Sequence, residues 1–239
     1  MITERDKEII RLINRFGYLT AAQMAKLMKM SQRVTYRRLQ KLAEGRYLIY
    51  NRVLAGKAGI YRATTRGLEE AGAELGRTVV RLLTLEHNLA VADIAAALLE
   101  KHPGTAWTTE RELRREAGQK FGVGWQGHIP DGVLILSSGE KIAVEYENTT
   151  KSKAALNRVL RAYLRQSQYQ EVWFVCRTRR QAERLKEATK RYDFVKIFEL
   201  KGVVQDEAVA YKVPVAAVLP AGAAGGTAAA GDDGGACGL

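Results

Sequence analysis

Three short helical segments followed by a β-hairpin begin the chain, and this order restricts the fold more than any other feature. Apolar side chains recur at helical spacing in residues 3–15, and Gly17 stops that segment. Thr3, Thr20 and Ser31 are suited to cap the three helices, because their hydroxyl groups accept hydrogen bonds from free amide groups. The spacing therefore predicts three helices joined by short turns.

The third helix is expected to run from Ser31 to about Glu44 and to end at Gly45, with Val34, Leu39 and Leu42 facing inward. Residues 47–54 and 60–64 are rich in β-forming side chains and flank a glycine-containing turn, which predicts a hairpin. Three helices and a hairpin predict a winged helix-turn-helix domain over residues 1–75. In such a domain the third helix lies in the major groove of DNA.

Outward side chains of the third helix are the candidate DNA contacts, together with basic residues on or beside the hairpin. These residues are Gln32, Arg33, Thr35, Tyr36 and Arg37, then Arg52, Lys57 and Arg62. Arg and Gln can bind base edges, while Thr, Tyr and the hairpin cations can bind phosphate. Two alternatives stay open: the basic side chains form an ordinary solvated face, or the winged helix contacts another protein.

The distribution of charge favours a nucleic-acid partner. The chain carries a net charge of +12, and residues 1–80 hold 16 Lys and Arg against 7 Asp and Glu. The remaining residues hold 22 against 19, so most of the basic field belongs to the N-terminal third. A surplus of this kind indicates a polyanionic partner, and double-stranded DNA is the expected one.

Several classes of protein are excluded by composition. No stretch approaches 18 uninterrupted apolar residues, so no membrane span is expected. The charged N-terminal residues lack the apolar run of a signal peptide. Two cysteines and three scattered histidines exclude a disulfide framework and a cysteine-rich zinc module. We therefore expect a cytoplasmic protein without membrane association.

Residues 83–213 are expected to form a second domain of the mixed α/β class. Helices are predicted over 83–100, 111–117, 152–165 and 180–192, and strands over 105–109, 169–176 and 194–200. Between them, residues 129–147 contain two β-forming runs separated by a Ser-Ser-Gly-Glu turn. This order implies a mixed sheet with helices packed against it. The Gly/Ala-rich residues 214–239 are predicted to be a disordered tail.

Two carboxylates lie on one face of an otherwise apolar predicted strand. Strand alternation places Glu145 and Glu147 on the same side, and Asp131 begins the strand that pairs with theirs. Burial of like charges is costly unless a cation compensates them, and Mg²⁺ or Mn²⁺ prefers oxygen ligands. Lys151 or Lys153 would add a further positive charge. The pattern predicts a metal site that polarises a phosphodiester.

An ordinary structural explanation of the same residues is equally open. Pro130, Asp131 and Gly132 also suit a common turn. Glu145 and Glu147 would then be solvated on an edge strand, and would pair with Lys151, Lys153 or Arg111. Spacing alone does not separate this arrangement from a metal site.

The acidic segment resembles a known nuclease core. Pro130-Asp131, then Glu145-x-Glu147 after a hairpin, then a nearby lysine, resembles the PD-(D/E)xK motif of restriction endonucleases. Glu147 stands where that motif has its lysine. The resemblance therefore implies Asp131, Glu145 and Glu147 as metal ligands, and Lys151 or Lys153 as the catalytic lysine that faces phosphate.

The wider layout resembles the replication-relaxation family of plasmids and mobile elements, in which a winged helix precedes a restriction-endonuclease-like domain. The likeness extends over about residues 3–200 and includes Leu85–Val91, Thr109–Leu113 and Ala143–Glu147. It implies a metal-dependent DNA nickase, similar to one class of conjugative relaxases. A non-catalytic regulator of replication or transcription is the alternative. Other replication or conjugation proteins, and a second copy of the chain, are possible partners.

Overall fold

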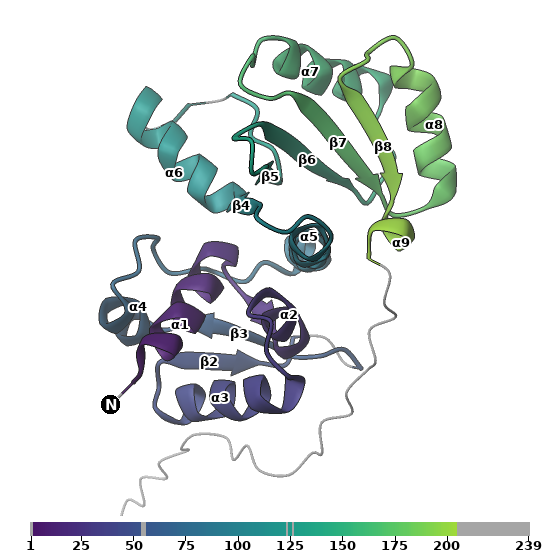
Figure 1. Ribbon diagram of the computed structural model, residues 1–239. Helices are drawn as coiled ribbons and strands as arrows, with labels where there is room; N and C mark the ends of the chain where they lie inside the picture. The colour runs from purple at the N-terminus through teal and green to yellow at the C-terminus, as the bar shows by residue number, and fades with distance from the viewer. Residues whose placement is uncertain (1, 54–55, 123, 126, 205–239) are drawn as a thin grey trace, which may run out of the picture. The chain divides into compact units, whose positions relative to one another are not determined.

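The computed structural model describes residues 2–53, 56–122, 124–125 and 127–204 (Figure 1). These residues belong to one compact unit of mixed α/β structure with two β-sheets. The predicted tail, residues 214–239, lies outside the described residues.

Three capped helices begin the chain, as the sequence predicts. They are α1 (Glu4–Phe16), α2 (Ala21–Leu27) and α3 (Gln32–Glu44). The hydroxyl group of Thr3 accepts from the amide of Asp6, whose carboxylate accepts from the amide of Thr3 in return. Thr20 forms the same capping box with Gln23, and Ser31 caps α3. The helix starts therefore follow from local side-chain hydrogen bonds.

The smaller sheet contains one strand that the sequence analysis does not predict. Its strands are β1 (Leu19–Thr20), β2 (Leu48–Asn51) and β3 (Ile60–Ala63), in the order β1-β3-β2, and both pairings are antiparallel. β2 and β3 form the predicted hairpin, whereas β1 has only two residues and gives no readable alternation. The sheet and α1–α3 enclose a core that includes Ile9, Ile13 and Leu39. Helix α4 (Thr65–Ala71) follows the hairpin.

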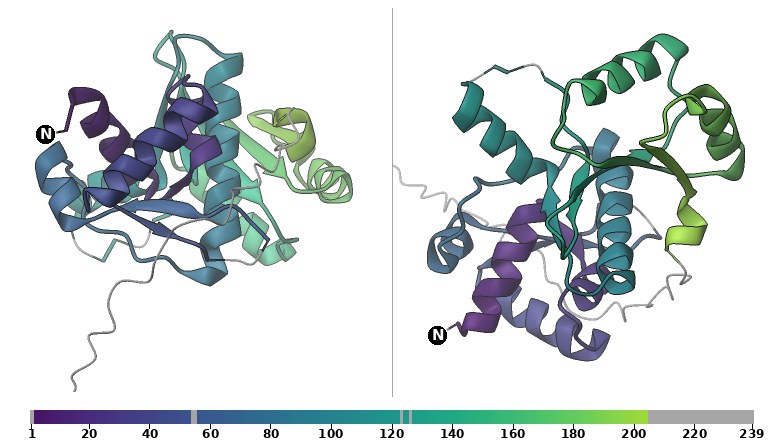
Figure 2. Two further views of the ribbon diagram at one scale, coloured as in Figure 1. Left: turned by 90° about the horizontal axis from the view of Figure 1, so that it is seen from below. Right: turned by 45° about the horizontal axis from the view of Figure 1, so that its top comes forward.

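Helix α5 (Leu82–Lys101) contacts both halves of the described fold (Figure 2). Ala92 packs into the core of α1–α3, whereas Ile94 and Leu98 pack against the larger sheet. By length and hydropathy alone, α5 would be suited to cross a membrane. Its side chains nevertheless pack against protein on two sides, in the core of the first three helices and in that of the larger sheet.

The larger sheet has a mixed strand order. Its strands are β4 (Ala106–Thr109), β5 (Gly132–Ile135), β6 (Lys141–Glu147), β7 (Glu171–Cys176) and β8 (Val195–Glu199). They lie in the order β4-β5-β6-β7-β8, antiparallel from β4 to β6 and parallel from β6 to β8. The helices of this half are α6 (Glu110–Phe121), α7 (Lys153–Leu164), α8 (Arg179–Thr189) and α9 (Leu200–Val203).

The two faces of the larger sheet have separate cores. Ile142, Val144 and Tyr146 of β6 face α5, whereas Ala143 packs with Leu156 and Leu160 of α7. This alternation places Glu145 and Glu147 with Ala143 on the α7 side, and the prediction that the two glutamates share one face is confirmed.

Candidate functional site

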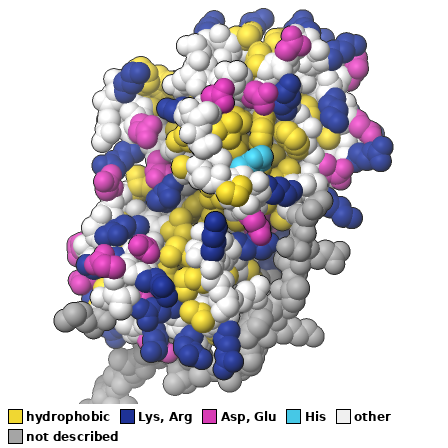
Figure 3. All heavy atoms as spheres, viewed as in Figure 1, with side chains coloured by type: hydrophobic (Ala, Val, Ile, Leu, Met, Phe, Trp, Pro, Cys, Tyr) yellow, Lys and Arg dark blue, Asp and Glu magenta, His cyan; other side chains and the backbone are white. Residues whose placement is uncertain are grey.

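The exposed face of α3 carries Gln32, Arg33 and Arg37. In the part of the chain that the structure describes, neither Arg33 nor Arg37 forms an ion pair or hydrogen bond. Arg38 differs, because its guanidinium pairs with Asp6 of α1, with 2.5 Å between Nε and Oδ1. Figure 3 shows Lys and Arg side chains gathered along the lower edge of the molecule, where α3 lies in Figure 1. The face is therefore basic and available to an anionic partner.

Thr35 does not belong to this face, which corrects the sequence prediction. Its side chain is fully buried, and Oγ1 donates to the carbonyl oxygen of Ser31 at 3.0 Å. Val34, which we expected to face inward, is 49% exposed. The buried stripe consists of Thr35, Leu39 and Leu42, spaced by four and three residues. Burial of a small hydroxyl group is tolerated here because it bonds back to the preceding turn.

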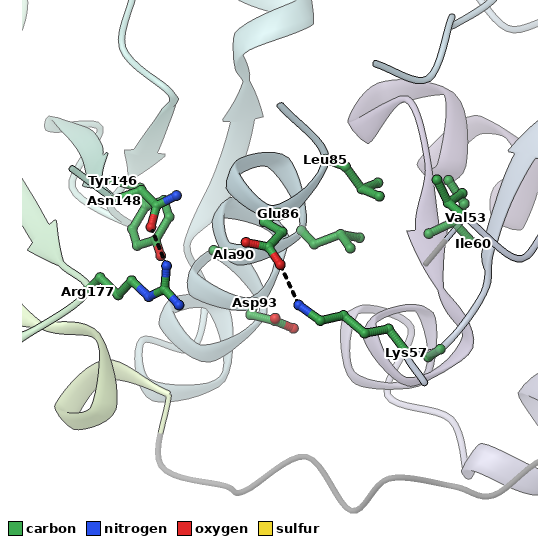
Figure 4. A pocket seen from close by; sticks show the side chains of 12 residues that line it. Val53, Lys57, Ile60, Leu85, Glu86, Ala90, Asp93, Tyr146, Asn148 and Arg177 are labelled. Carbon is green, nitrogen blue, oxygen red and sulfur yellow. Dashed lines mark hydrogen bonds and ion pairs between the residues drawn. The ribbon is translucent and has the colours of Figure 1, made fainter. Parts of the chain in front are cut away.

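The remaining predicted DNA contacts lie on or beside the hairpin. Arg52 is exposed, and Nε of Arg62 donates to Oδ1 of Asn51 at 3.0 Å. Lys57 forms an ion pair with Glu86 of α5 at 2.5 Å, across a cavity of about 230 Å³ (Figure 4). Both partners are at least half exposed, so this pair contributes little to stability, and Lys57 can exchange Glu86 for phosphate.

Glu145 and Glu147 are buried, which rules out the solvated edge-strand arrangement. Their exposed fractions are 4% and 6%, and β6 is an interior strand paired with β5 and β7. Burial of two carboxylates on one face requires donors or cations close by. Each carboxylate finds a different partner.

Glu145 accepts hydrogen bonds from two side chains that the sequence analysis did not assign to a site. The hydroxyl group of Tyr163 donates to Oε1, and His128 Nε2 lies 2.6 Å from the same oxygen. His128 Nε2 is also 3.2 Å from the Tyr163 oxygen. Burial, with the charge of Glu145, raises the pKa of Tyr163 well above its usual range, so the hydroxyl group stays a donor. We call these three residues the His128 cluster.

Glu147 forms an ion pair with Lys151. Burial raises the pKa of Glu147, and the hydrogen bond and charge of Lys151 act against that rise. Lys153, the first residue of α7, is exposed and forms no ion pair with the residues described. Of the two candidate lysines, Lys151 is the one beside the acidic pair.

The carboxylate of Asp131 is bound by the backbone amide of Tyr146 and by His87, a residue of α5. Its Oδ2 accepts from the amide of Tyr146 at 2.8 Å, and its Oδ1 lies 3.0 Å from Nε2 of His87. Burial lowers the pKa of His87, but the hydrogen bond and charge of Asp131 outweigh burial, and the net shift is upward. His87 is therefore a partner of Asp131, which the sequence analysis did not predict.

As arranged, the three carboxylates do not fit a metal ion. Each is engaged by a different donor: Asp131 by His87, Glu145 by the His128 cluster, and Glu147 by Lys151. Among the described residues, no group of three or more His, Cys, Asp or Glu side chains is gathered closely enough to hold a metal. The assignment of these residues as metal ligands stays a prediction.

Comparison with known sequences identifies one family. The family model described as Replication-relaxation matches residues 10–174. No curated protein matches the chain.

Proposed function

The chain belongs to the replication-relaxation family, which indicates a role in the replication or mobilisation of plasmids or mobile elements, and we propose that it acts there by binding double-stranded DNA through α3. The proposal treats residues 1–75 as a winged helix-turn-helix domain and the larger sheet as a nuclease-like domain. It also places the protein in the cytoplasm, where its DNA partner would be.

The order of elements supports both domain assignments. Helices α1 to α3 are followed by the β2–β3 hairpin, and β1 completes a small antiparallel sheet, which is the expected layout of a winged helix. In the larger sheet, α5 precedes β4, β5 and β6, and α7 connects β6 to the parallel strand β7. That order is compatible with a restriction-endonuclease-like core.

The unpaired cations of α3 carry the proposal. Arg33 and Arg37 are four residues apart and so lie on one side of the helix, away from the buried stripe of Thr35, Leu39 and Leu42. A guanidinium group without a carboxylate partner can bind guanine edges or phosphate oxygens with two parallel hydrogen bonds. Their position matches that of the side chains that a recognition helix presents to the major groove.

Binding of duplex DNA tests this proposal directly. We would measure fluorescence anisotropy with labelled duplexes that tile the DNA flanking the gene, at fixed salt. Arg33→Ala and Arg37→Ala are expected to weaken specific binding by about 1–3 kcal/mol each, roughly a fivefold to hundredfold rise in Kd. Arg184→Ala, at an exposed arginine of α8, is the matched control and should leave Kd unchanged. Unchanged binding by both α3 variants would overturn the proposal.

Metal-dependent nicking is the second candidate function, favoured by the burial of Glu145 and Glu147 on one face of β6. Its test is conversion of supercoiled plasmid to open circle in Mg²⁺ or Mn²⁺, with a chelator control. Glu147→Ala and Glu147→Gln should abolish product and leave duplex binding intact, whereas Glu140→Gln, at an exposed turn carboxylate, should cut like wild type. Tight binding without any product would favour a non-catalytic regulator.

A further inference from the structure

A second cavity, of about 370 Å³, is lined by residues of α1, α5, β4 and the start of α6, and by residues of the segment that precedes α5. Four arginines and a histidine contribute to its lining: Arg15, Arg77, Arg81, Arg111 and His87. Aromatic side chains, Phe16, Tyr18 and Trp107, complete much of the wall. A cavity of this size falls within the range of small-molecule binding sites. We call it the arginine cavity.

Three buried hydrogen-bond donors in the wall of the arginine cavity lack acceptors. They are Oγ1 of Thr78, Nε1 of Trp107 and Nη1 of Arg111, none of which has a hydrogen-bond partner among the described residues. Buried polar atoms are nearly always paired, so three such donors around one cavity require an explanation. The Trp107 and Arg111 nitrogens can only donate, and the Thr78 hydroxyl group can donate or accept, so an acceptor is the one kind of group that would satisfy all three.

Two carboxylates, Glu110 and Asp131, also line the arginine cavity, and both already have a partner. Glu110 pairs with Arg114 at 2.5 Å, and Asp131 pairs with His87. Arg15 is neutralised by Glu112, at 2.6 Å. The wall therefore offers no free carboxylate to its remaining arginines.

Three arginines consequently lack a counter-charge within the described part of the chain. Arg77 and Arg81 are exposed and form no ion pair there, and Nη2 of Arg111 donates only to the carbonyl oxygen of Gly76, at 2.7 Å. Burial lowers the pKa of Arg111, and no carboxylate opposes that effect. A partly buried cation without a partner is costly, and an anion in the cavity would remove that cost.

Gly17 lies beside two residues of the arginine cavity, Thr78 and Arg111. Its φ is +86°, and a Cβ atom there would lie 3.1 Å from Nη1 of Arg111 and 3.2 Å from Oγ1 of Thr78. Both contacts are tighter than ordinary van der Waals distances. Glycine therefore satisfies the backbone conformation and leaves these two donors uncrowded.

We propose that the arginine cavity binds the phosphate group of a nucleotide. Phosphate supplies acceptor oxygens without competing donors, and its charge complements Arg77, Arg81 and Arg111. The aromatic wall offers a surface for the attached base. The phosphate would come from a free nucleotide or from the end of a nucleic-acid strand. This site is separate from α3, so duplex recognition and phosphate binding can fail independently.

Titration with defined phosphate probes tests the proposal in the full chain. Inorganic phosphate, pyrophosphate and ATP would be added while the intrinsic tryptophan fluorescence and the heat of binding are recorded. Wild type should bind at least one probe saturably, with a Kd below about 1 mM. Arg81→Gln and Arg111→Gln should weaken binding at least about tenfold, and Arg184→Gln on α8 should leave it unchanged. Because Arg81 is exposed, its variant is expected to fold even if Arg111→Gln does not.

A second arm separates the two sources of phosphate. Single-stranded oligonucleotides with and without a 5′-phosphate would be compared, again with Arg81→Gln. If the 5′-phosphate raises the affinity for the oligonucleotide, and Arg81→Gln abolishes that rise, the ligand is a strand end. If ATP binds but the 5′-phosphate does not raise the affinity, the ligand is a free nucleotide. No saturable binding of any probe, or binding that both arginine variants retain in full, would overturn the proposal. In that event bound water alone would satisfy the three donors.

Discussion

Nε of Arg15 lies 2.6 Å from Oε1 of Glu112, and this ion pair joins the last turn of α1 to the first turn of α6. Glu112 also closes a capping box, because its Oε2 accepts from the amide of Thr109 at 2.8 Å. One carboxylate thus starts a helix and fixes that helix to another. Burial raises the pKa of Glu112, but Arg15 and the amide of Thr109 outweigh burial and lower it.

Glu112→Gln should therefore destabilise the protein in a pH-dependent way. A lowered folded-state pKa gives stability that is present above the unfolded pKa of about 4.3 and is lost as pH falls through the folded value. We expect a loss of about 1 kcal/mol at pH 7, because Arg15 is partly exposed. Urea unfolding at pH 7 and at pH 3 checks this: the difference between variant and wild type should shrink at the lower pH. A constant difference would show that the charge of Glu112 plays no part.

Thr35→Val tests the corrected orientation of α3. The side chain is buried and bonds to Ser31, so its loss should leave the Kd for duplex DNA unchanged within about twofold. Stability should fall by about 1 kcal/mol, since the replacement keeps the shape and removes one hydrogen bond. Anisotropy and urea unfolding of the same preparation give both values. A large loss of affinity in a stable variant would return Thr35 to the DNA-binding face.

Tyr163→Phe should lower the free energy of unfolding, because it removes one donor to the buried Glu145 carboxylate. Loss of the hydroxyl donor leaves His128 as the remaining side-chain donor to Oε1, and we expect about 1–3 kcal/mol of destabilisation. The double variant Tyr163→Phe with Glu145→Gln should recover part of that loss, because the neutral amide is cheaper to bury. Equilibrium unfolding of the single and double variants measures the coupling. Additive losses would show that the two side chains do not interact.

Asp93→Asn should stabilise the protein at neutral pH. Burial raises the pKa of Asp93, and the hydrogen bond from Gln23 opposes only part of that rise. A raised carboxyl pKa means that the folded state binds the proton more tightly, so stability falls as pH rises through the folded pKa. The variant keeps an acceptor for Gln23 and should gain up to about 1 kcal/mol at pH 7. The gain should vanish below the unfolded pKa of about 3.9. Thermal melts of the variant and the wild type, at pH 7 and at a pH below about 3.9, measure this gain.

Local patterns predicted the secondary structure well because the responsible interactions are local. Thr3, Thr20 and Ser31 cap helices through amides three residues away, so the signal lies within one turn. The prediction of which α3 side chains face outward was partly wrong, because that depends on how the helix packs against the rest of the domain. Thr35 was assigned outward by its polarity, whereas its position relative to Leu39 and Leu42 places it inside.

The site was less predictable because its partners are distant in sequence. Alternation correctly put Glu145 and Glu147 on one face of β6, but it gives no information on what covers that face. His128 and Tyr163 are 17 and 18 residues from Glu145 in the sequence: His128 precedes β5, and Tyr163 lies on α7. The spacing of Leu156, Leu160 and Tyr163 does put the tyrosine toward the sheet, and that was the available signal.

Helix α5 has a consequence for how the chain unfolds. Its side chains belong to the core of the first three helices and also to the core of the larger sheet, so neither core is complete without it. Melting of either half would strip apolar contacts from the other, and the two halves should lose their structure together. Differential scanning calorimetry would then record one heat-absorption peak. Residues 72–81, which connect α4 to α5, would then join two halves that differ in function and yet unfold as one cooperative unit.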